Sequence, residues 1–347
     1  MYSFDPLSDS RWLEFVQHHP HSSVFHSRAW IEAIHHSYGY QPIAFTTSPC
    51  GADLQNAVVF CLIDSWLTGR RLVSLPFSDH CEPLLDSESD MLLIGDMLLQ
   101  ELRRQRLSYM ELRPLNVPIG PGLRCSGTYC LHRLDLAPSL DVLYGNLHKN
   151  STQRKIRRAE RERLEYLEGR SDSFLDTFYR LWIHTRRRHL APPQPMKWFR
   201  NLMQGFGEAL TIRVASKDGR AVASILTLHH KDTLVYKYGC SDARFHNLGG
   251  MHLLFWKSVE EAKRRGLRFF DLGRSDANNE GLITFKNRWG AARSALTYFS
   301  SSNQKSIYRS PRPQPGDWAD TAVKSLSRRL SDPLFRRLGS VMYRHIG

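Results

Sequence analysis

Hydrophobic periodicity runs through the same order of elements twice along this chain: short helices, antiparallel strands, a long helix and a further strand. In the first half, helices are expected over 8–19, 27–37 and 88–105, and strands over 41–46, 56–63, 71–75, 108–113 and 129–134. In the second half, helices are expected over 140–147, 151–167, 171–188, 196–205, 250–265 and 282–289, and strands over 210–216, 221–229, 233–238, 268–272 and 295–300. An order that repeats predicts two α/β domains of similar build, over residues 1–139 and 140–300.

The length and the apolar content fit two domains. The chain has 347 residues, of which 41% are apolar, enough for two cores. Its longest apolar run, residues 57–63, is far shorter than the roughly 20 residues that span a bilayer. The N-terminus lacks the basic and apolar regions of an export signal, and the six cysteines form no Cys-x-x-Cys pair. We therefore expect a cytoplasmic protein with reduced thiols and no metal site.

The charge balance indicates an anionic partner. A formal net charge of +14 and a pI near 9.7 suit nucleic acid, a phosphate-bearing substrate or the inner leaflet of a membrane. Residues 301–347 hold nine Lys or Arg and three Asp, and amphipathic helices are expected over 317–330 and 333–346. This basic helical tail is either a helix pair packed on the second domain or an amphipathic segment that binds an anionic membrane surface. In the membrane interpretation the apolar face consists of Trp318, Leu334, Phe335, Leu338 and Met342.

Candidate catalytic residues are densest in the second domain, in the segments 236–241, 248–250, 270–275 and 281–290. The last of these reads Gly-Leu-x-x-Phe-Lys-x-x-Trp-Gly. It resembles a segment of the tandem-GNAT acyltransferases, the branch that includes the Fem-type aminoacyltransferases of peptidoglycan cross-bridge synthesis. The basic stretch 155–160 and the entry segment 22–30 resemble further motifs of that branch. The resemblance covers most of residues 10–300.

This resemblance implies two tandem GNAT-like domains that transfer an acyl or aminoacyl group to an amine. The donor is an acyl-CoA or an aminoacyl-tRNA, used as a co-substrate, and no cofactor is tightly bound. The stretch from His246 to Met251 departs at both ends from the usual GNAT fingerprint, Arg/Gln-x-x-Gly-x-Gly/Ala, so both donors stay open. Fem-type enzymes that use a uridine-diphosphate-linked precursor carry a lysine about one turn after the entry-motif tryptophan. The residues after Trp30, 31–36, include no lysine. The acceptor is then another amine, such as a lipid- or sugar-linked amine of the cell envelope.

Acyl transfer to an amine requires a grip on the donor phosphates, stabilisation of an oxyanion and an exit for the amine proton. Gly249 and Gly250 directly precede an expected helix, where free backbone amides form an anion site, and His246 lies just before them. These residues are the candidates for donor binding. The alternative is an ordinary helix that begins with glycine.

Lys286, Arg274 and Tyr238 are the candidate catalytic residues. By the resemblance, Lys286 lies where developing charge or a donor phosphate needs a cation; the alternative is an exposed, solvated lysine. Arg274 follows a strand, so its guanidinium either reaches a carboxylate or phosphate or pairs with Asp271 or Asp276. Tyr238 either donates to the oxyanion or relays a proton, or else it only packs.

Substrate-binding residues are expected in the first domain as well. Asp79 and His80 lie in the loop 78–83, which recognises the acceptor unless it is a solvated turn. Its ionisable side chains are consecutive, a spacing that argues against a metal site. Glu111 and Arg113 share one face of a strand, so they point into a cleft between the domains or form an ion pair at a sheet edge.

Arg154 and Arg157 belong to the basic helix 151–167, which meets tRNA or a pyrophosphate unless it is a solvated face. We therefore predict an N-acyltransferase that modifies an amine of a cell-envelope or polysaccharide precursor. It works in the cytoplasm or at the inner face of the membrane, and no DNA partner is expected. The competing hypothesis is a non-catalytic protein on a degenerate GNAT fold that binds nucleic acid or a membrane surface.

Overall fold

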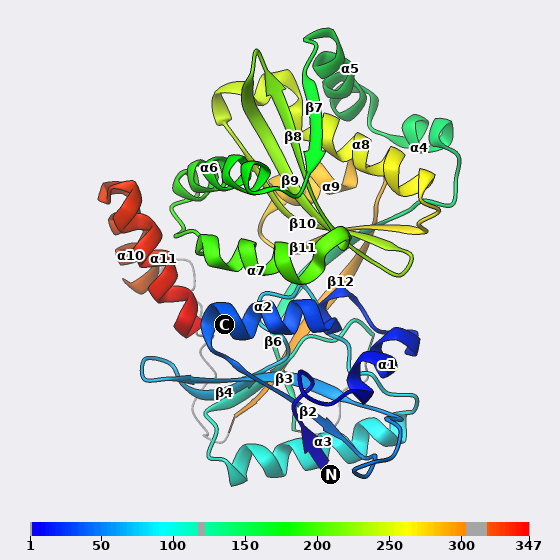
Figure 1. Ribbon diagram of the computed structural model, residues 1–347, viewed down its shortest axis with the longest axis vertical. Coiled ribbons are helices and arrows are strands. Elements are labelled where there is room, and N and C mark those ends of the chain that lie inside the picture. Colours follow the sequence, from blue (N-terminus) through cyan, green and yellow to red (C-terminus); the bar gives the residue numbers. More distant parts are fainter. Residues whose placement is uncertain (1, 117–121, 303–317, 347) are drawn as a thin grey trace. The chain divides into compact units, whose positions relative to one another are not determined.

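A computed structural model describes residues 2–116, 122–302 and 318–346, without the side chains of Glu88 and of residues 318–323 (Figure 1). Its internal contacts divide the chain into two compact units. Unit 1 comprises Met1–Tyr129, Leu296–Asp320 and Ser340–Gly347, and unit 2 comprises Cys130–Ala295 and Thr321–Gly339. Both units are mixed α/β structures, as the repeated order of elements predicts.

Unit 1 contains a sheet in the order β1-β2-β3-β4-β5-β12, in which only the β4–β5 pair is parallel. Helix α3 packs on one face of this sheet, where Phe45 and Phe60 meet Ile94 and Leu98. The strands are β1 (Tyr2–Phe4), β2 (Gln41–Thr46), β3 (Val58–Ser65), β4 (Gly69–Val73), β5 (Tyr109–Leu112), β6 (Arg124–Asp135) and β12 (Ala292–Ser302). The helices are α1 (Arg11–His18), α2 (Arg28–Tyr38) and α3 (Glu88–Arg104). Strands β6 and β12 each continue into unit 2.

Unit 2 contains a sheet in the order β11-β10-β9-β8-β7, in which β10 and β11 are parallel. Helices α5 and α8 pack on one face of it and helices α6 and α7 on the other (Figure 1). The strands are β7 (Glu165–Gly169), β8 (Leu210–Lys217), β9 (Arg220–His230), β10 (Thr233–Ser241) and β11 (Phe269–Asp276). The helices are α4 (Leu140–Asn146), α5 (Arg154–Arg161), α6 (Asp172–Arg188), α7 (Met196–Phe206), α8 (Gly250–Arg264) and α9 (Glu280–Asn287).

The C-terminal residues form helices α10 (Trp318–Arg329) and α11 (Asp332–Ile346), which pack on the folded units. Phe335 is fully buried in unit 2, where the guanidinium of Arg187 lies 4.6 Å from the centre of its ring. A Cβ on Gly339 would lie 1.9 Å from the carbonyl oxygen of Pro193, so only glycine fits there. The expected apolar face is therefore partly used inside the protein, although Leu334 is exposed. Of the described helices, none is long and apolar enough to cross a membrane.

Two expectations differ from the structure. The helix predicted over 151–167 ends at Arg161, and Glu165–Gly169 is strand β7 instead, paired with β8. Arg163 has a φ of +52°, which a helix cannot continue through. The units divide at Tyr129 and at Ala295, inside β6 and β12. The domain boundaries at 139 and 300, placed from the order of elements, stay a prediction.

Candidate active site

Strands β10 and β11 are joined over only part of their length. They pair in parallel from Thr233–Val235 to Phe269–Asp271, and both continue beyond that ladder, to Ser241 and to Asp276. Beyond these three residue pairs, the β10–β11 ladder does not continue. Tyr238 and Arg274, two of the predicted catalytic residues, lie in these continuing segments.

A β-bulge at Lys237 gives β10 one extra residue relative to β9. The bulge reverses the alternation of side chains, so Tyr236 packs on Phe255 of α8 while Tyr238 packs among the rings of α6 and α7. The buried Tyr238 hydroxyl accepts a hydrogen bond from Trp198 Nε1 at 2.9 Å. Tyr238 is thus a packed residue, as the alternative interpretation expects.

The start of helix α8 lies directly against α5. Gly249 has a φ of +83°, and a Cβ there would lie 2.2 Å from the carbonyl oxygen of Lys155. Gly250 is crowded by β9 side chains, at 3.2 Å from an added Cβ. Lys155 Nζ donates to the carbonyls of His246 and Asn247, each at 3.2 Å. Packing therefore requires both glycines, and it also brings a cation of α5 to the N-terminal end of α8.

Further cations surround Lys155. Its pKa is lowered by burial and by repulsion from Arg154 and Arg158. The side chains of Arg154 and Arg157 are exposed, and Arg157 donates to Gln153 Oε1 at 3.1 Å. Positive charge thus accumulates where the α8 amides already favour an anion.

His246 belongs to the same region. Its Nε2 lies 2.8 Å from Ser241 Oγ and 3.4 Å from an Arg188 nitrogen. Burial, followed by repulsion from Arg188 and Lys155, lowers the pKa of His246. The imidazole is therefore neutral at pH 7 and available for hydrogen bonding to a ligand.

Lys286 is buried, so the interpretation of an exposed, solvated lysine is wrong. Its side chain is only 2% exposed, and Nζ donates to the carbonyls of Gly273 at 2.7 Å and Arg274 at 3.0 Å. The structure thus brings Lys286 to the backbone of Arg274. The Arg274 side chain is partly exposed and lies 3.8 Å from Asp276, as the ion-pair alternative anticipates.

His132 on β6 is a residue that sequence reasoning missed. It is fully buried, and its Nε2 lies 2.9 Å from the Asn287 side-chain oxygen, next to Lys286. Burial lowers the pKa of His132, Lys286 and Arg293 lower it further, and Asp271 opposes them. This histidine lies in the strand expected over 129–134. It alternates with Cys130 and Leu134, so the sequence could have indicated that its side chain points to the buried face.

In unit 1, the structure brings Asp79, Glu111 and Arg113 together. Arg113 is buried and forms an ion pair with Glu111 at 2.8 Å, and it also donates to the Ser78 carbonyl at 3.3 Å. Tyr298 donates its hydroxyl to the Asp79 carbonyl at 2.6 Å. The Glu111–Arg113 ion pair that the alternative describes is present, but β5 pairs with both β4 and β12, so the pair is not at a sheet edge.

The loop 78–83 is buried, so its interpretation as a solvated turn is wrong. His80 is 6% exposed and meets the Phe25 ring edge-on at 5.1 Å. Glu82 accepts hydrogen bonds from the backbone amides of Leu115 and Asn116, and its burial raises the pKa of its carboxyl. Among the described residues, no group of three or more His, Cys, Asp or Glu could hold a metal ion.

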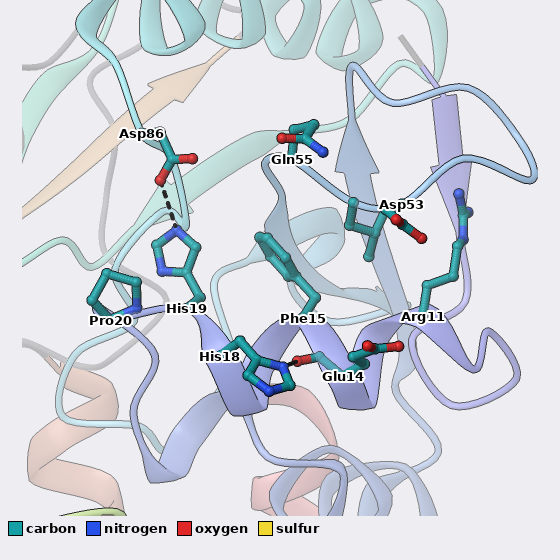
Figure 2. A pocket seen from close by; sticks show the side chains of 10 residues that line it. Arg11, Glu14, Phe15, His18, His19, Pro20, Asp53, Gln55 and Asp86 are labelled. Carbon is teal, nitrogen blue, oxygen red and sulfur yellow. Dashed lines mark hydrogen bonds and ion pairs between the residues drawn. The ribbon is translucent and has the colours of Figure 1, made fainter.

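A pocket of about 320 Å³ opens in unit 1 beside helix α1 (Figure 2). His19 points toward Asp86 across it at 3.6 Å, and His18 bonds the Glu14 carbonyl at 2.9 Å. Arg11, on the far side, is paired with Asp9 at 2.7 Å. The candidate residues do not line this pocket, so it lies outside the site described above.

Known proteins resemble both the sequence and the fold. Residues 147–287 match the family described as Acetyltransferase (GNAT) domain. A UDP-N-acetylmuramoylpentapeptide-lysine N(6)-alanyltransferase of Weissella viridescens is 23% identical over 146 residues, 41% of this chain and 43% of that protein. The crystal structure of FemX superposes with a TM-score of 0.67 at 14% identity, over 87% of this chain and 97% of that one. A tandem GNAT protein from the clavulanic acid biosynthesis pathway gives 0.52 at 12% identity, over 86% and 95%.

The matched domain and the shared fold support an acyltransferase of the GNAT type. The resemblance to Fem-like GNAT acyltransferases that the sequence indicates is confirmed. The chain spans less than half the length of the alanyltransferase that it matches.

Proposed function

We propose that this protein transfers an acyl or aminoacyl group from a CoA-type thioester or an aminoacyl-tRNA to an amine of a cell-envelope or polysaccharide precursor. The observation that carries the proposal is the start of α8. There, helix amides, two glycines and the cations of α5 meet beside the open segments of β10 and β11. A donor with a phosphate group and an acyl group requires both features side by side.

Arg154, Lys155 and Arg157 bind the phosphates of the donor, together with the amides of Gly250 and the next residue. His246, neutral at pH 7, adds a hydrogen bond at the same edge. Both donors carry phosphate, next to the aminoacyl ester in aminoacyl-tRNA and at the far end of the pantetheine arm in acyl-CoA, so a phosphate site suits either. An aminoacyl-tRNA would also contact the exposed face of α5.

In the transfer, the amine attacks the acyl carbonyl carbon and forms a C–N bond. The C–S bond of a thioester, or the C–O bond of an aminoacyl ester, then breaks, and the proton that the amine loses passes to Tyr238, where it replaces the proton given to the leaving group. Arg274 stabilises the oxyanion, and the Tyr238 hydroxyl donates a proton to the leaving sulfur or oxygen. Lys286 holds the backbone of β11 in place and adds a fixed positive charge beneath Arg274.

The printed name of the relative from Weissella viridescens describes alanyl transfer to N6 of the lysine in UDP-N-acetylmuramoylpentapeptide. Because the sequence lacks the lysine after Trp30 that enzymes with a uridine-diphosphate-linked precursor carry, we propose a lipid- or sugar-linked amine of the cell envelope as the acceptor here. In unit 1, the buried His80 and Arg113 and the partly exposed Asp79 and Glu111 are proposed to shape the acceptor site. A cytoplasmic enzyme near the inner membrane face would meet such an acceptor.

A transfer assay tests the proposal. Purified protein is incubated with acetyl-CoA or with aminoacyl-tRNA and a lysine-containing peptidoglycan precursor, and the acceptor mass is measured. We expect one donor to add its acyl mass, and R154A/R157A to lower kcat/KM for that donor at least about tenfold. The control R264A removes an exposed arginine at the other end of α8 and should change little. No transfer from either donor, with salt-dependent binding to any RNA, would favour the non-catalytic hypothesis.

A further inference from the structure

The turn between β3 and β4 presents two adjacent large apolar side chains to solvent. Trp66 is 85% exposed and Leu67 is 62% exposed. Trp66 is the most exposed large hydrophobic residue in the described part of the chain. By contrast, the other tryptophans with described side chains are 8% exposed or less: Trp12, Trp30, Trp182, Trp198, Trp256 and Trp289. Apolar surface that remains exposed at one place marks an interaction site.

Hydrogen bonds hold this turn in a fixed conformation. Ser65 Oγ accepts from the backbone amides of Leu67 at 3.2 Å and Thr68 at 3.1 Å. It also lies 2.9 Å from His345 Nδ1, and Thr68 donates to the His345 carbonyl at 2.8 Å. The last turn of α11 therefore braces the tip, and Trp66 and Leu67 are displayed on a rigid support.

A buried arginine completes this support. Arg71 is fully buried, donates to the His345 carbonyl at 2.6 Å and lies 5.8 Å from the centre of the Tyr109 ring. Its charge neutralises the carbonyl end of α11. Burying a guanidinium is costly, so the tip is built as a defined structure.

The charge around the tip identifies the occupant. Two exposed arginines belong to the segments that form the tip: Arg70 follows Leu67 by three residues, and Arg344 precedes His345, whose ring meets the Trp66 ring edge-on at 5.5 Å. Asp64 lies opposite Arg70 in the strand register. The whole chain carries +14. A tryptophan beside arginines is the composition that settles in the headgroup region of an anionic bilayer. Two side chains on a convex turn are too small for a stable protein interface, which buries about 1,000 Å² or more.

We propose that the Trp66–Leu67 tip inserts into the headgroup region of an anionic lipid bilayer and docks the protein on the membrane surface. The proposal concerns binding alone, so it stands or falls independently of the proposed acyl transfer. It places the membrane contact on the turn between β3 and β4, whereas the sequence indicated the C-terminal helices.

Vesicle binding of the full-length protein tests this proposal. Vesicles of phosphatidylcholine with 30% phosphatidylglycerol are compared with pure phosphatidylcholine, by sedimentation and by quenching of tryptophan fluorescence with brominated lipid. We expect binding to the anionic vesicles, quenching that W66F largely removes, and at least about tenfold weaker binding of W66S/L67S. The control L92S, which changes an exposed leucine of α3, should bind as the unchanged protein does.

Unchanged binding of W66S/L67S would overturn the proposal, as would quenching that persists in W66F. Folding is checked by the thermal midpoint, which these exposed positions should leave unchanged. The alternative occupant of the tip is a second copy of the chain, and sedimentation equilibrium without lipid tests for it. If the protein forms dimers that W66S/L67S abolishes, the tip is a dimer contact, and membrane docking is contradicted.

Discussion

A buried lysine needs acceptors for its ammonium group, and Lys286 finds them in two backbone carbonyls of β11. The sequence indicates the importance of Lys286 through its motif, but it does not indicate the burial, because a lysine on a short helix is usually solvated. His132 escapes notice for the opposite reason. Alternation along a strand shows which residues share a face, but not which polar residue the core will enclose.

Lys286 and Arg274 should respond differently to substitution. Lys286→Met keeps most of the volume but leaves two carbonyls without a donor, so we expect kcat/KM to fall roughly 10–1000-fold and stability to fall by about 1–3 kcal/mol. Arg274→Ala should lower kcat/KM over the same range with little change in thermal midpoint. Steady-state kinetics and thermal unfolding measure both, with the exposed Lys197→Met as control. Full activity in both variants would place the chemistry elsewhere.

At the scale of elements, the contact between α5 and α8 sets the candidate donor site. Apart from β1 and β7, the order of helices and strands could be predicted for both units, and β2 matches its expected bounds of 41–46. The end of α5 could not be predicted, because the charged pattern typical of a surface helix continues through residues 151–167. The turn that ends the helix is visible only in the structure, as the positive φ of Arg163. Likewise, Gly249 and Gly250 were predicted to bind an anion, whereas the closeness of Gly249 to α5 and of Gly250 to β8 and β9 depends on tertiary packing.

Gly249→Ala should damage this contact. The substitution places a methyl group 2.2 Å from the Lys155 carbonyl and also strains a φ of +83°. We expect a loss of about 3 kcal/mol or more in the free energy of unfolding, measured by denaturant titration. Gly266→Ala is the matched control, since Gly266 has a φ of +71° but open space around it, and it should cost only about 1–2 kcal/mol. Equal losses would show that α5 does not press on Gly249.

His252, near the start of α8, should make stability depend on pH. Burial, with repulsion from Lys155 and Arg288, lowers its pKa from 6.5 to about 4. The unfolded chain therefore takes up a proton that the folded chain refuses, and stability present above pH 6.5 is lost as pH falls toward 4. Between pH 7 and pH 4, the free energy of unfolding should fall by roughly 2–3 kcal/mol less in His252→Gln than in the wild-type protein. Parallel stability curves for the two proteins would contradict this assignment.

At the scale of the whole molecule, the C-terminal helices belong to the folded units. The sequence showed their amphipathic pattern but left open whether the apolar face meets protein or membrane. Arg187 decides part of that question, because it donates to the carbonyls of Ser327 and Leu330 and pairs with Asp332. Contacts between segments far apart in sequence cannot be read from periodicity.

Phe335→Ala should therefore destabilise unit 2. The ring is fully buried, so we expect a loss of about 3–5 kcal/mol in the free energy of unfolding. Leu334→Ala, which changes the neighbouring residue at 52% exposure, should stay within about 0.5 kcal/mol. Thermal and denaturant unfolding compare the two. A small loss of stability in Phe335→Ala would contradict this packing and favour the membrane-binding interpretation of α11.

The central claim is that the start of α8, beneath the cations of α5, binds the donor phosphates. The most direct measurement is the dissociation constant of the preferred donor at two salt concentrations, for the unchanged protein, R154A/R157A and R264A. The account predicts donor binding at least about tenfold weaker in R154A/R157A, with a shallower salt dependence, and unchanged binding in R264A. Equal affinity in all three proteins would contradict it.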